Sequence, residues 1–383
     1  MTYDFLNSGK GLTVFYHEDN DGFAAAAYFQ YHLELLNKNV KKVKFLSVQY
    51  NRKLPTPGVH FPQSTASDIL ILDFSLKYHE YETLLKKGYN VTVIDHHGTA
   101  ENVLRDVKLK YPDSFQYVFD LNKCGAMLTV EYMRKCYPVL DPDHTKVDYL
   151  INLVDLRDRG LVFSKPVDIS PSLIEEALWL FDGSMFLLNN LKNVDTLTHF
   201  TKCEMYKDLW INILKTTFTS SINEWVSTHS VNCKIDENST LAIYNYSDIM
   251  FMGIALRKLK NEQLEEALKY VNKPTLTTLK VSETETKQFS VIWHNYTGEN
   301  TSDFGNLIAE KMDCDFVILY RVKVTNGLDT SPLSTAALST VMECKLELRG
   351  LKDNIDLGEI AKLNFNGGGH KKAAGGITGY VFS

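Results

Sequence analysis

The feature that most constrains the fold of this chain is a short apolar stretch that ends abruptly in charged residues. Residues 91–94 (VTVI) are followed by Asp95, His96, His97 and a glycine. Short apolar runs rich in β-branched residues are typical of buried parallel strands. Ligands of open α/β sheets bind beyond the carboxyl ends of such strands. The motif therefore predicts a functional site at the edge of a parallel sheet.

Two other apolar runs, 12–16 and 69–72, end in the same way. The side chains that follow them are His17, Asp19, Asp21 and Asp73. Because the carboxyl ends of parallel strands meet at one edge of the sheet, we expect all three groups to lie together. Carboxylates that are crowded in this way repel each other unless cations lie between them. The three strand ends therefore predict a metal cluster.

The residue types in this cluster indicate which metal it binds. Carboxylates and imidazoles without thiolates suit Mn²⁺, and suit Mg²⁺ less well. Two ions that share one carboxylate form the usual hydrolytic clamp on a phosphate. Asp73 is the expected bridge, because it comes alone from a strand between the other two ligand strands.

Composition excludes several classes of function. A length of 383 residues predicts two or three domains. A net charge of −6 argues against a general binder of duplex DNA, which needs a broad basic face. The six cysteines form no C-x-x-C pair, which indicates reduced thiols of a cytosolic protein. No apolar run approaches the roughly 20 residues of a membrane helix, so we expect a cytoplasmic protein without a membrane partner.

The pattern of elements divides the chain into three parts. Strands and helices alternate in residues 1–163, which predicts a doubly wound, mostly parallel sheet of the α/β class. Residues 164–284 are mainly helical and are expected to form a connector, with a polar linker at 274–288. Strands and helices return in residues 285–383, which predicts a smaller α/β domain. The active site is expected in the cleft between the two domains.

A second group of candidate residues lies near the end of the chain. Gly367, Gly368 and Gly369 precede His370. Successive glycine amides can form a concave site for a phosphate, although a purely structural turn explains the same pattern. Arg349 follows an alternating strand and could bind a phosphate in bidentate fashion, or be an exposed arginine at a strand end. Both pairs of interpretations stay open at this point.

Taken together, these motifs resemble those of the DHH phosphoesterase family. The matching segments are residues 17–22 for the first motif, Asp73 for the second, Asp95 to His97 for the motif that names the family, and Asp155 for the fourth. Residues 366–375 resemble the glycine-rich signature of the DHH-associated C-terminal domain. This combination is typical of the subfamily that includes RecJ exonuclease and nanoRNase-type oligoribonucleases.

The resemblance implies a role for each candidate residue. The implied metal ligands are His17, Asp19, Asp21, Asp73, His96 and Asp155. The residues implied in catalysis are His97, Asp95 and Asp73. The residues implied in substrate binding are Arg349, Gly367, Gly368, Gly369 and His370. The fourth motif is ambiguous, since Asp158 also lies near the helix end; Asp155 is chosen because it directly follows the apolar part of the helix.

The activity that the resemblance implies is a two-metal phosphodiesterase. It would use two Mn²⁺ ions, or Mg²⁺ less well, to hydrolyse short single-stranded oligonucleotides to mononucleotides. One alternative is a phosphoesterase acting on a cyclic or linear dinucleotide, or on a nucleotide 3′-phosphate. Another is a non-catalytic, nucleotide-binding member of the family. Whether the protein forms a homodimer is left open.

Overall fold

The computed structural model describes most of the chain in nine segments. They are residues 5–38, 42–50, 52–64, 67–141, 144–192, 198–215, 246–298, 301–326 and 340–381. The chain forms two compact units, residues 1–258 and 259–383, and each unit is described here by itself.

The first unit is built around a parallel sheet of five strands. The strands are β1 (Gly11–His17), β2 (Val43–Val48), β3 (Ser67–Leu72), β4 (Val91–Asp95) and β5 (Phe115–Phe119). Their order in the sheet is β2-β1-β3-β4-β5, and every pair is parallel. The chain leaves β1 for β2 on one side and returns to β3 on the other. This reversal between β1 and β3 is the topological switch point at which such sheets bind ligands.

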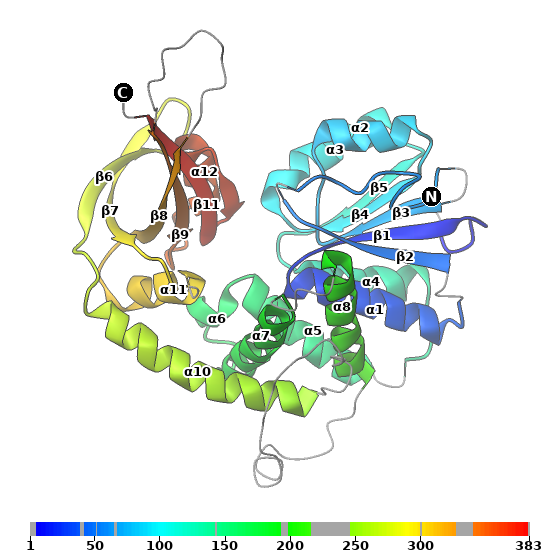
Figure 1. The fold of residues 1–383 in the computed structure, drawn as a ribbon, viewed down its shortest axis with the longest axis horizontal. Helices are drawn as coiled ribbons and strands as arrows, with labels where there is room; N and C mark the ends of the chain where they lie inside the picture. The colour runs from blue at the N-terminus through cyan, green and yellow to red at the C-terminus, as the bar shows by residue number, and fades with distance from the viewer. Residues whose placement is uncertain are drawn as a thin grey trace. The chain divides into compact units, whose positions relative to one another are not determined.

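Helices cover both faces of this sheet, as Figure 1 shows. The four helices are α1 (Asn20–Leu35), α2 (Tyr78–Lys86), α3 (Glu101–Lys110) and α4 (Gly125–Cys136). Alternate strand residues point to opposite faces. Val14 and Leu70 therefore pack with α1 and α4, whereas Phe15 and Ile71 pack with α2 and α3. Burial on both faces explains why these strands are continuous apolar runs rather than alternating ones, and it confirms the predicted fold class.

The helices expected to form a connector are α7 (Pro171–Lys192), α8 (His199–Lys215) and α10 (Tyr246–Leu268). They follow α5 (His144–Asp158) and the short α6 (Leu161–Ser164). Rather than standing apart, α7 and α8 share the hydrophobic core of α1 and α5. Phe23 of α1 meets Tyr206 of α8 edge to face, with ring centroids 4.6 Å apart. The division into three parts stays a prediction; the structure forms two compact units, whose boundary lies within α10.

Helices α7 and α10 cross at very short range. A Cβ atom added to Gly183 would lie 2.0 Å from the carbonyl oxygen of Ile249, and one added to Gly253 would lie 1.9 Å from that of Trp179. Only glycine leaves room for such a close approach of two backbones. These two glycines therefore fix how α7 lies within the first unit.

The second unit contains a mixed sheet of six strands. The strands are β6 (Thr275–Lys280), β7 (Thr286–Asn295), β8 (Phe316–Asn326), β9 (Thr340–Arg349), β10 (Gly368–His370) and β11 (Ala373–Val381). Their order is β10-β11-β9-β8-β7-β6, and only β7 and β8 pair in parallel. Helix α12 (Leu357–Phe365) packs on one face and α11 (Thr301–Lys311) on the other. The linker expected at 274–288 is wrong, because these residues pair as the antiparallel strands β6 and β7.

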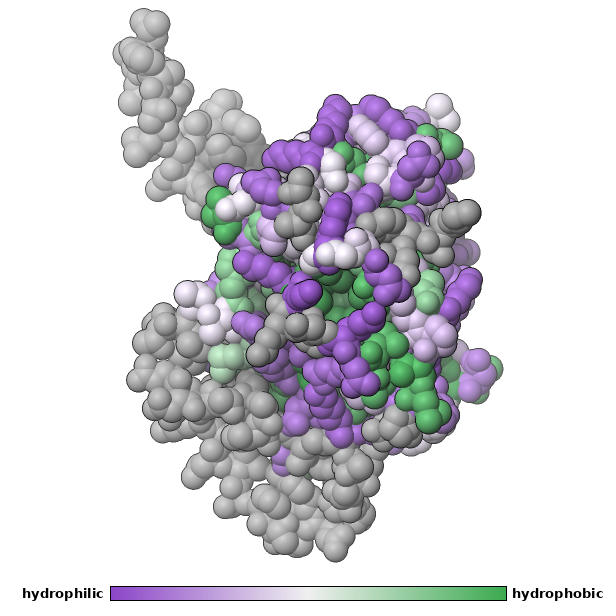
Figure 2. Space-filling view, turned by 90° about the vertical axis from the view of Figure 1, so that its right-hand side faces the viewer, coloured by the Kyte–Doolittle hydropathy of each residue, from purple (hydrophilic) through white to green (hydrophobic). Residues whose placement is uncertain are grey.

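Within the residues that the structure describes, no helix combines the length and apolarity needed to cross a membrane. The face seen in Figure 2 is mainly hydrophilic, with smaller groups of hydrophobic residues between the polar ones.

Candidate metal centre

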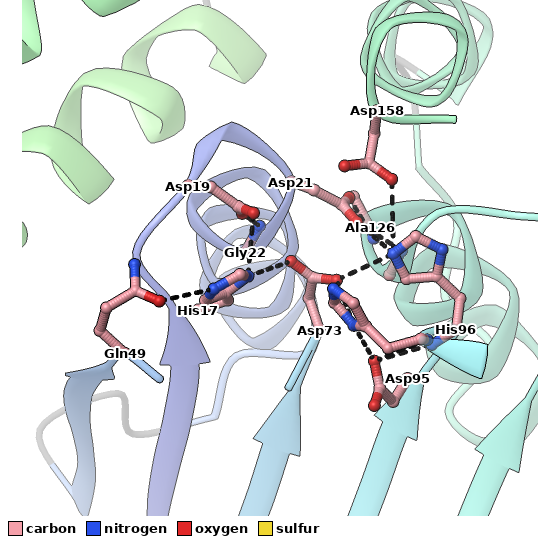
Figure 3. Close-up of polar contacts among 12 residues, drawn as sticks. His17, Asp19, Asp21, Gly22, Gln49, Asp73, Asp95, His96, Ala126 and Asp158 are labelled. Carbon is pink, nitrogen blue, oxygen red and sulfur yellow. Dashed lines mark hydrogen bonds and ion pairs between the residues drawn. The ribbon is translucent and has the colours of Figure 1, made fainter. Parts of the chain in front are cut away.

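The carboxyl ends of β1, β3 and β4 bring the three predicted motifs together. His17 ends β1, Asp73 follows β3, and Asp95 ends β4. Figure 3 shows the side chains of these motifs pointing toward one another above the strand ends. The site thus lies at the switch point of the sheet, where the three separate segments of sequence were expected to meet.

Asp73 lies at the middle of the site, and its two oxygens face different partners. Oδ2 is 3.5 Å from Nδ1 of His17, and Oδ1 is 3.2 Å from Nε2 of His96. The residue has no exposed surface. Neither oxygen forms a hydrogen bond of regular geometry with another described residue. Buried carboxylate oxygens nearly always have such a partner, so this pair is an exception that needs an explanation.

On one side of Asp73 lies a group that we call the His17 group, consisting of His17, Asp19 and Asp73. Nδ1 of His17 is 2.9 Å from Oδ2 of Asp19. The other ring nitrogen, Nε2, is 3.1 Å from Oε1 of Gln49, the residue after β2. An outer hydrogen bond of this kind fixes the ring and the tautomer of a ligating histidine, here leaving Nδ1 for the ligand role. Asp19 also caps helix α1, because its Oδ1 accepts from Gly22 N at 2.9 Å.

On the other side lies the His96 group, consisting of Asp21, His96 and Asp158. Nε2 of His96 is 3.6 Å from Oδ2 of Asp21 and 3.4 Å from Oδ2 of Asp158. All three side chains offer ligand atoms within 4.8 Å of one another. With Asp73 3.2 Å from the same nitrogen, this group has four potential ligands from four separate segments of the chain.

The N-terminus of helix α4 holds Asp21 in place through both of its carboxylate oxygens. Oδ2 of Asp21 accepts from Gly125 N at 2.6 Å, and Oδ1 accepts from Ala126 N at 2.7 Å. These amides have no partner within the helix, and the helix dipole favours negative charge there. The first turn of α4 therefore orients Asp21 toward His96, while burial and the neighbouring carboxylates Asp73 and Asp158 raise the pKa of Asp21 well above its usual value.

The structure favours Asp158 over the expected Asp155 in the metal centre. The carboxylate of Asp155 accepts from Cys124 N at 2.7 Å and from Nη1 of Arg159 at 3.1 Å. Asp155 thus anchors α5 to the start of α4, whereas Asp158, one helical turn later, faces His96. Apolar periodicity could not separate the two, because both lie near the end of the same helix.

Asp95 acts on His97 rather than on the His17 or His96 group. Its Oδ1 is 2.7 Å from Nδ1 of His97 and accepts from His96 N at 2.8 Å. Its Oδ2 accepts from the hydroxyl of Ser75 at 2.5 Å. Asp95 therefore orients the His97 ring through its contact with Nδ1. The catalytic roles expected for His97, Asp95 and Asp73 stay predictions.

The electrostatics of the site show how strongly it favours positive charge. Burial lowers the pKa of His96, but Asp73, Asp158 and Asp21 outweigh it and raise the pKa to about 11. Burial also lowers the pKa of His17, and Asp19 and Asp73 reverse the shift, so that it is raised well above its usual value. Burial raises the pKa of Asp158 to about 6. Where no other cation is present, the carboxylates therefore stabilise the protonated form of the neighbouring imidazoles.

These observations fit a divalent metal better than a network of ion pairs. The buried oxygens of Asp73 and Oδ2 of Asp158 lack regular hydrogen bonds within the described residues. The donor set of imidazoles and carboxylates, without thiolates, matches that of Mn²⁺ or Mg²⁺. The residues that would hold the metal are His17, Asp19, Asp21, Asp73, His96 and Asp158.

The candidate substrate residues in the second unit have structural roles of their own. Arg349 is mostly buried, and its guanidinium donates to the Ser302 hydroxyl at 2.7 Å and to the Leu348 carbonyl at 2.8 Å. A Cβ atom on Gly367 would lie 1.9 Å from the carbonyl oxygen of Gly375.

The rest of the glycine-rich turn, from Gly368 to His370, forms strand β10 and pairs with β11. Gly369 has a φ of 145°, a conformation that L side chains rarely adopt. Close packing of β10 on β11 is therefore sufficient to require glycine at 367 and 369, whether or not the turn also binds a phosphate.

Three contributors to the site, Gln49, Ser75 and Gly125, were absent from the sequence candidates. Gln49 and Ser75 each follow a strand closely, which is a weak signal that could have placed them at the same edge. Gly125 gave no such signal, because its role depends on a neighbour 52 positions away. A Cβ atom there would lie 2.5 Å from Cβ of Asp73. At this contact Asp73 adopts a left-handed backbone conformation, with a φ of 54°, and Gly125 must lack a side chain.

Comparison with known proteins gives the following similarities. No family model matches the chain. A 3′,5′-cyclic-nucleotide phosphodiesterase of Helicobacter pylori is 26% identical over 163 residues, which cover 37% of this chain and 42% of that relative. The chain thus matches less than half the length of this curated relative.

Solved structures that resemble the chain include RecJ from Thermus thermophilus in complex with Mn²⁺, which is 17% identical with a TM-score of 0.49. That match covers 98% of this chain and 50% of RecJ. A DHH domain of a protein from the s1p family of ribosomal proteins is 13% identical, with a TM-score of 0.43 and coverage of 98% and 84%. The chain is therefore similar to RecJ and DHH-domain proteins, the family that its motifs resemble.

The contact between Gly125 and Asp73 gives a first testable prediction. Gly125→Ala should weaken Mn²⁺ binding by about 10- to 100-fold, the usual effect of displacing a residue that supports a metal ligand. The physical reason is that the added methyl group pushes against Cβ of Asp73. Titration calorimetry measures the affinity. Gly98→Ala is the matched control, because its Cβ would meet only the end of Leu121, at 3.4 Å. Equal affinity in the two variants would contradict this account.

The raised pKa values of His96 and His17 give a second prediction. At pH 8 the His96 imidazole is protonated in the metal-free protein, because its pKa is raised to about 11, and the raised pKa of His17 favours its protonated form as well. A metal ligand must be neutral, so binding should release protons, and Mn²⁺ affinity should rise with pH.

Calorimetry in buffers of different ionisation enthalpy measures this release. We expect about one proton fewer per protein in His96→Gln than in the unchanged chain. His79→Gln, at an exposed position on α2, is the control and should behave like the unchanged chain. Binding without proton release, or an affinity that falls as pH rises, would refute the electrostatic argument.

Proposed function

We propose that this chain is a metal-dependent phosphodiesterase that hydrolyses short single-stranded oligonucleotides to mononucleotides. The observation that supports this most directly is Asp73, whose two oxygens face two separate groups of histidine and carboxylate ligands. Two ions bridged by one carboxylate, about 3.5–4 Å apart, are typical of enzymes that hydrolyse phosphate esters. Mn²⁺ is the preferred ion in this proposal, because imidazole nitrogens bind it better than Mg²⁺.

Each group of residues has a part in the proposed reaction. His17 and Asp19 would hold one ion, Asp21, His96 and Asp158 the other, and Asp73 both. Ions bound there polarise the phosphate oxygens and lower the pKa of a coordinated water. Burial lowers the pKa of His97, but Asp95 outweighs it and the net shift is upward. This shift favours the protonated form of His97, whose Nε2 would donate to an oxygen of the substrate.

The overall charge and the similarity to known proteins agree with this class of reaction. The curated relative is a phosphodiesterase, and its match to this chain is partial. The net charge of −6 is unfavourable for an enzyme that tracks long strands, which needs an extended basic groove. A short substrate, gripped through one or two nucleotides, is therefore the better candidate.

A second candidate substrate is a cyclic or linear dinucleotide or a nucleotide 3′-phosphate, which the activity in the relative's name favours. A non-catalytic nucleotide-binding protein is the third candidate. It is less favoured, because a chain that has lost its chemistry is not expected to keep a buried, convergent set of carboxylates and imidazoles at such an electrostatic cost.

The third prediction tests the proposed substrate directly. We expect the Mn²⁺-loaded protein to cleave a five-nucleotide RNA faster than pApA, cyclic di-AMP or phosphoadenosine phosphate, all measured side by side. Mn²⁺ should support a higher rate than Mg²⁺, and Ca²⁺ should inhibit, since it prefers more oxygen ligands at longer distances. If the five-nucleotide RNA is not cut while a dinucleotide is, the second candidate replaces the first.

Asp73→Asn is the matched control for this panel, because it keeps the shape of the side chain and removes its charge. It should lose metal and activity on every substrate while the protein stays folded in thermal unfolding. Full activity of this variant would exclude a bridging role for Asp73.

The fourth prediction concerns the second unit, for which we propose a role in gripping the nucleotide through Arg349 and the turn from Gly367 to His370. Arg349→Ala should lower kcat/KM for oligonucleotides by about 10- to 100-fold, the usual loss for a charged hydrogen bond. It should leave the hydrolysis of a small aryl phosphodiester unaffected, because that substrate has no remote part that could contact Arg349.

Lys352→Ala, an exposed change in the same unit, is the control and should affect neither substrate. If Arg349→Ala lowers both rates equally, its contacts with Ser302 and Leu348 are its whole role, and the glycine turn is structural only.

A further inference from the structure

The first unit contains a cavity that the metal ligands only partly account for. Its volume is about 140 Å³, and it lies among α5, α7, α8 and the start of α1. One part of its wall is formed by Asp19, Asp21 and Asp158, the carboxylates of the metal centre. The cavity is thus continuous with the place where a reacting phosphate would lie.

The opposite wall is apolar and comes largely from helices that have no part in metal binding. Leu180 and Phe181 lie on α7, and Trp210 lies on α8. Whole ligand sites usually measure about 300–1,000 Å³. A cavity of about 150 Å³ is known to accept a single benzene ring. The size and the wall therefore suit one flat ring system rather than a complete dinucleotide.

Asn20 supplies an unsatisfied polar group in the same cavity. Its side chain is 9% exposed, and its Oδ1 accepts from the Tyr206 hydroxyl at 2.6 Å and from the Ser184 hydroxyl at 3.4 Å. Ser184 also donates to the Phe181 carbonyl at 3.0 Å, so the Tyr206 hydroxyl is the main partner of this oxygen. Nδ2, at the other end, has no hydrogen-bond partner among the described residues. A buried NH₂ group of this kind calls for an acceptor on a ligand.

Arg157 completes the wall with a flat cation. The central carbon of its guanidinium lies 4.0 Å from the ring centroid of Phe181 and 4.9 Å from that of Phe163. Nucleobases stack on aromatic rings and on arginine planes, and they carry carbonyl and ring-nitrogen acceptors. Phe181 and Trp210 thus offer aromatic surfaces for stacking and Asn20 offers a donor, which are the two things a base requires.

We propose that this cavity binds the nucleobase of the nucleotide whose phosphate lies at the metal centre. The proposal builds on the proposed function and narrows its substrate to phosphoesters with a base next to the reacting phosphate. It also gives helices α7 and α8 a function: they close the cavity by supplying Ala177, Leu180, Phe181 and Trp210.

The test compares the binding of two monophosphates to the full chain loaded with Mn²⁺. Adenosine 5′-monophosphate and ribose 5-phosphate carry the same phosphate and sugar, and only the first has a base. By titration calorimetry we expect the first to bind about 10-fold tighter or more, the usual gain from stacking one base. Equal affinity of the two compounds would overturn the proposal.

A variant that fills the cavity tests the location. Ala177 lines the cavity and is 1% exposed. In Ala177→Met, the affinity for adenosine monophosphate should fall to that for ribose 5-phosphate, which should itself stay unchanged. Glu175→Met, at an exposed position on the same helix, should keep the full difference. If Ala177→Met also keeps it, the base binds elsewhere.

A crystal structure of the unchanged protein with Mn²⁺ and adenosine monophosphate decides the question should Ala177→Met not fold. Adenine beside Trp210 and Phe181 supports the proposal, and adenine at any other place refutes it. The binding assay also separates this inference from the proposed function. A base preference without hydrolysis of any phosphodiester refutes only the function. Hydrolysis without a base preference refutes only the pocket.

Discussion

The buried carboxylate of Asp73 is the constraint on which the rest of the first unit depends. It lies at the switch point of the sheet without regular hydrogen bonds, between imidazoles of two separate motifs. Such a group is costly to bury unless a cation neutralises it. The raised pKa values of His17 and His96 have the same cause, because a protonated imidazole also places positive charge next to the carboxylate. Stability and metal binding are therefore linked at one residue.

The start of helix α4 holds the carboxylates around Asp73 in a defined arrangement. Its first amides bind Asp21 from the first motif and Asp155 from α5, while Gly125 lets Asp73 approach. Residues more than 100 positions apart are thereby held by one helix N-terminus, where negative charge is favoured. A helix that carries no ligand of its own thus organises ligands from three other segments.

The helices after α5 extend the site instead of merely joining two units. Gly183 and Gly253 allow α7 and α10 to cross with their backbones almost in contact, and Phe23 packs against Tyr206 to hold α8 on α1. This packing places apolar side chains next to the carboxylates of the metal centre. Under the two proposals, the chemistry of the phosphate and the recognition of the base would both take place within the first unit.

The sequence by itself determined the parallel sheet and the edge at which its motifs meet. Buried strands and their ends can be recognised from short apolar runs and the polar residues that follow them. Tertiary structure alone decided which neighbours complete the site. Asp158 rather than Asp155 faces His96, because helix packing, not periodicity, sets which carboxylate points there. Gln49 and Gly125 act through space on residues distant in sequence. Contacts of that kind depend on how elements pack, which no local pattern specifies.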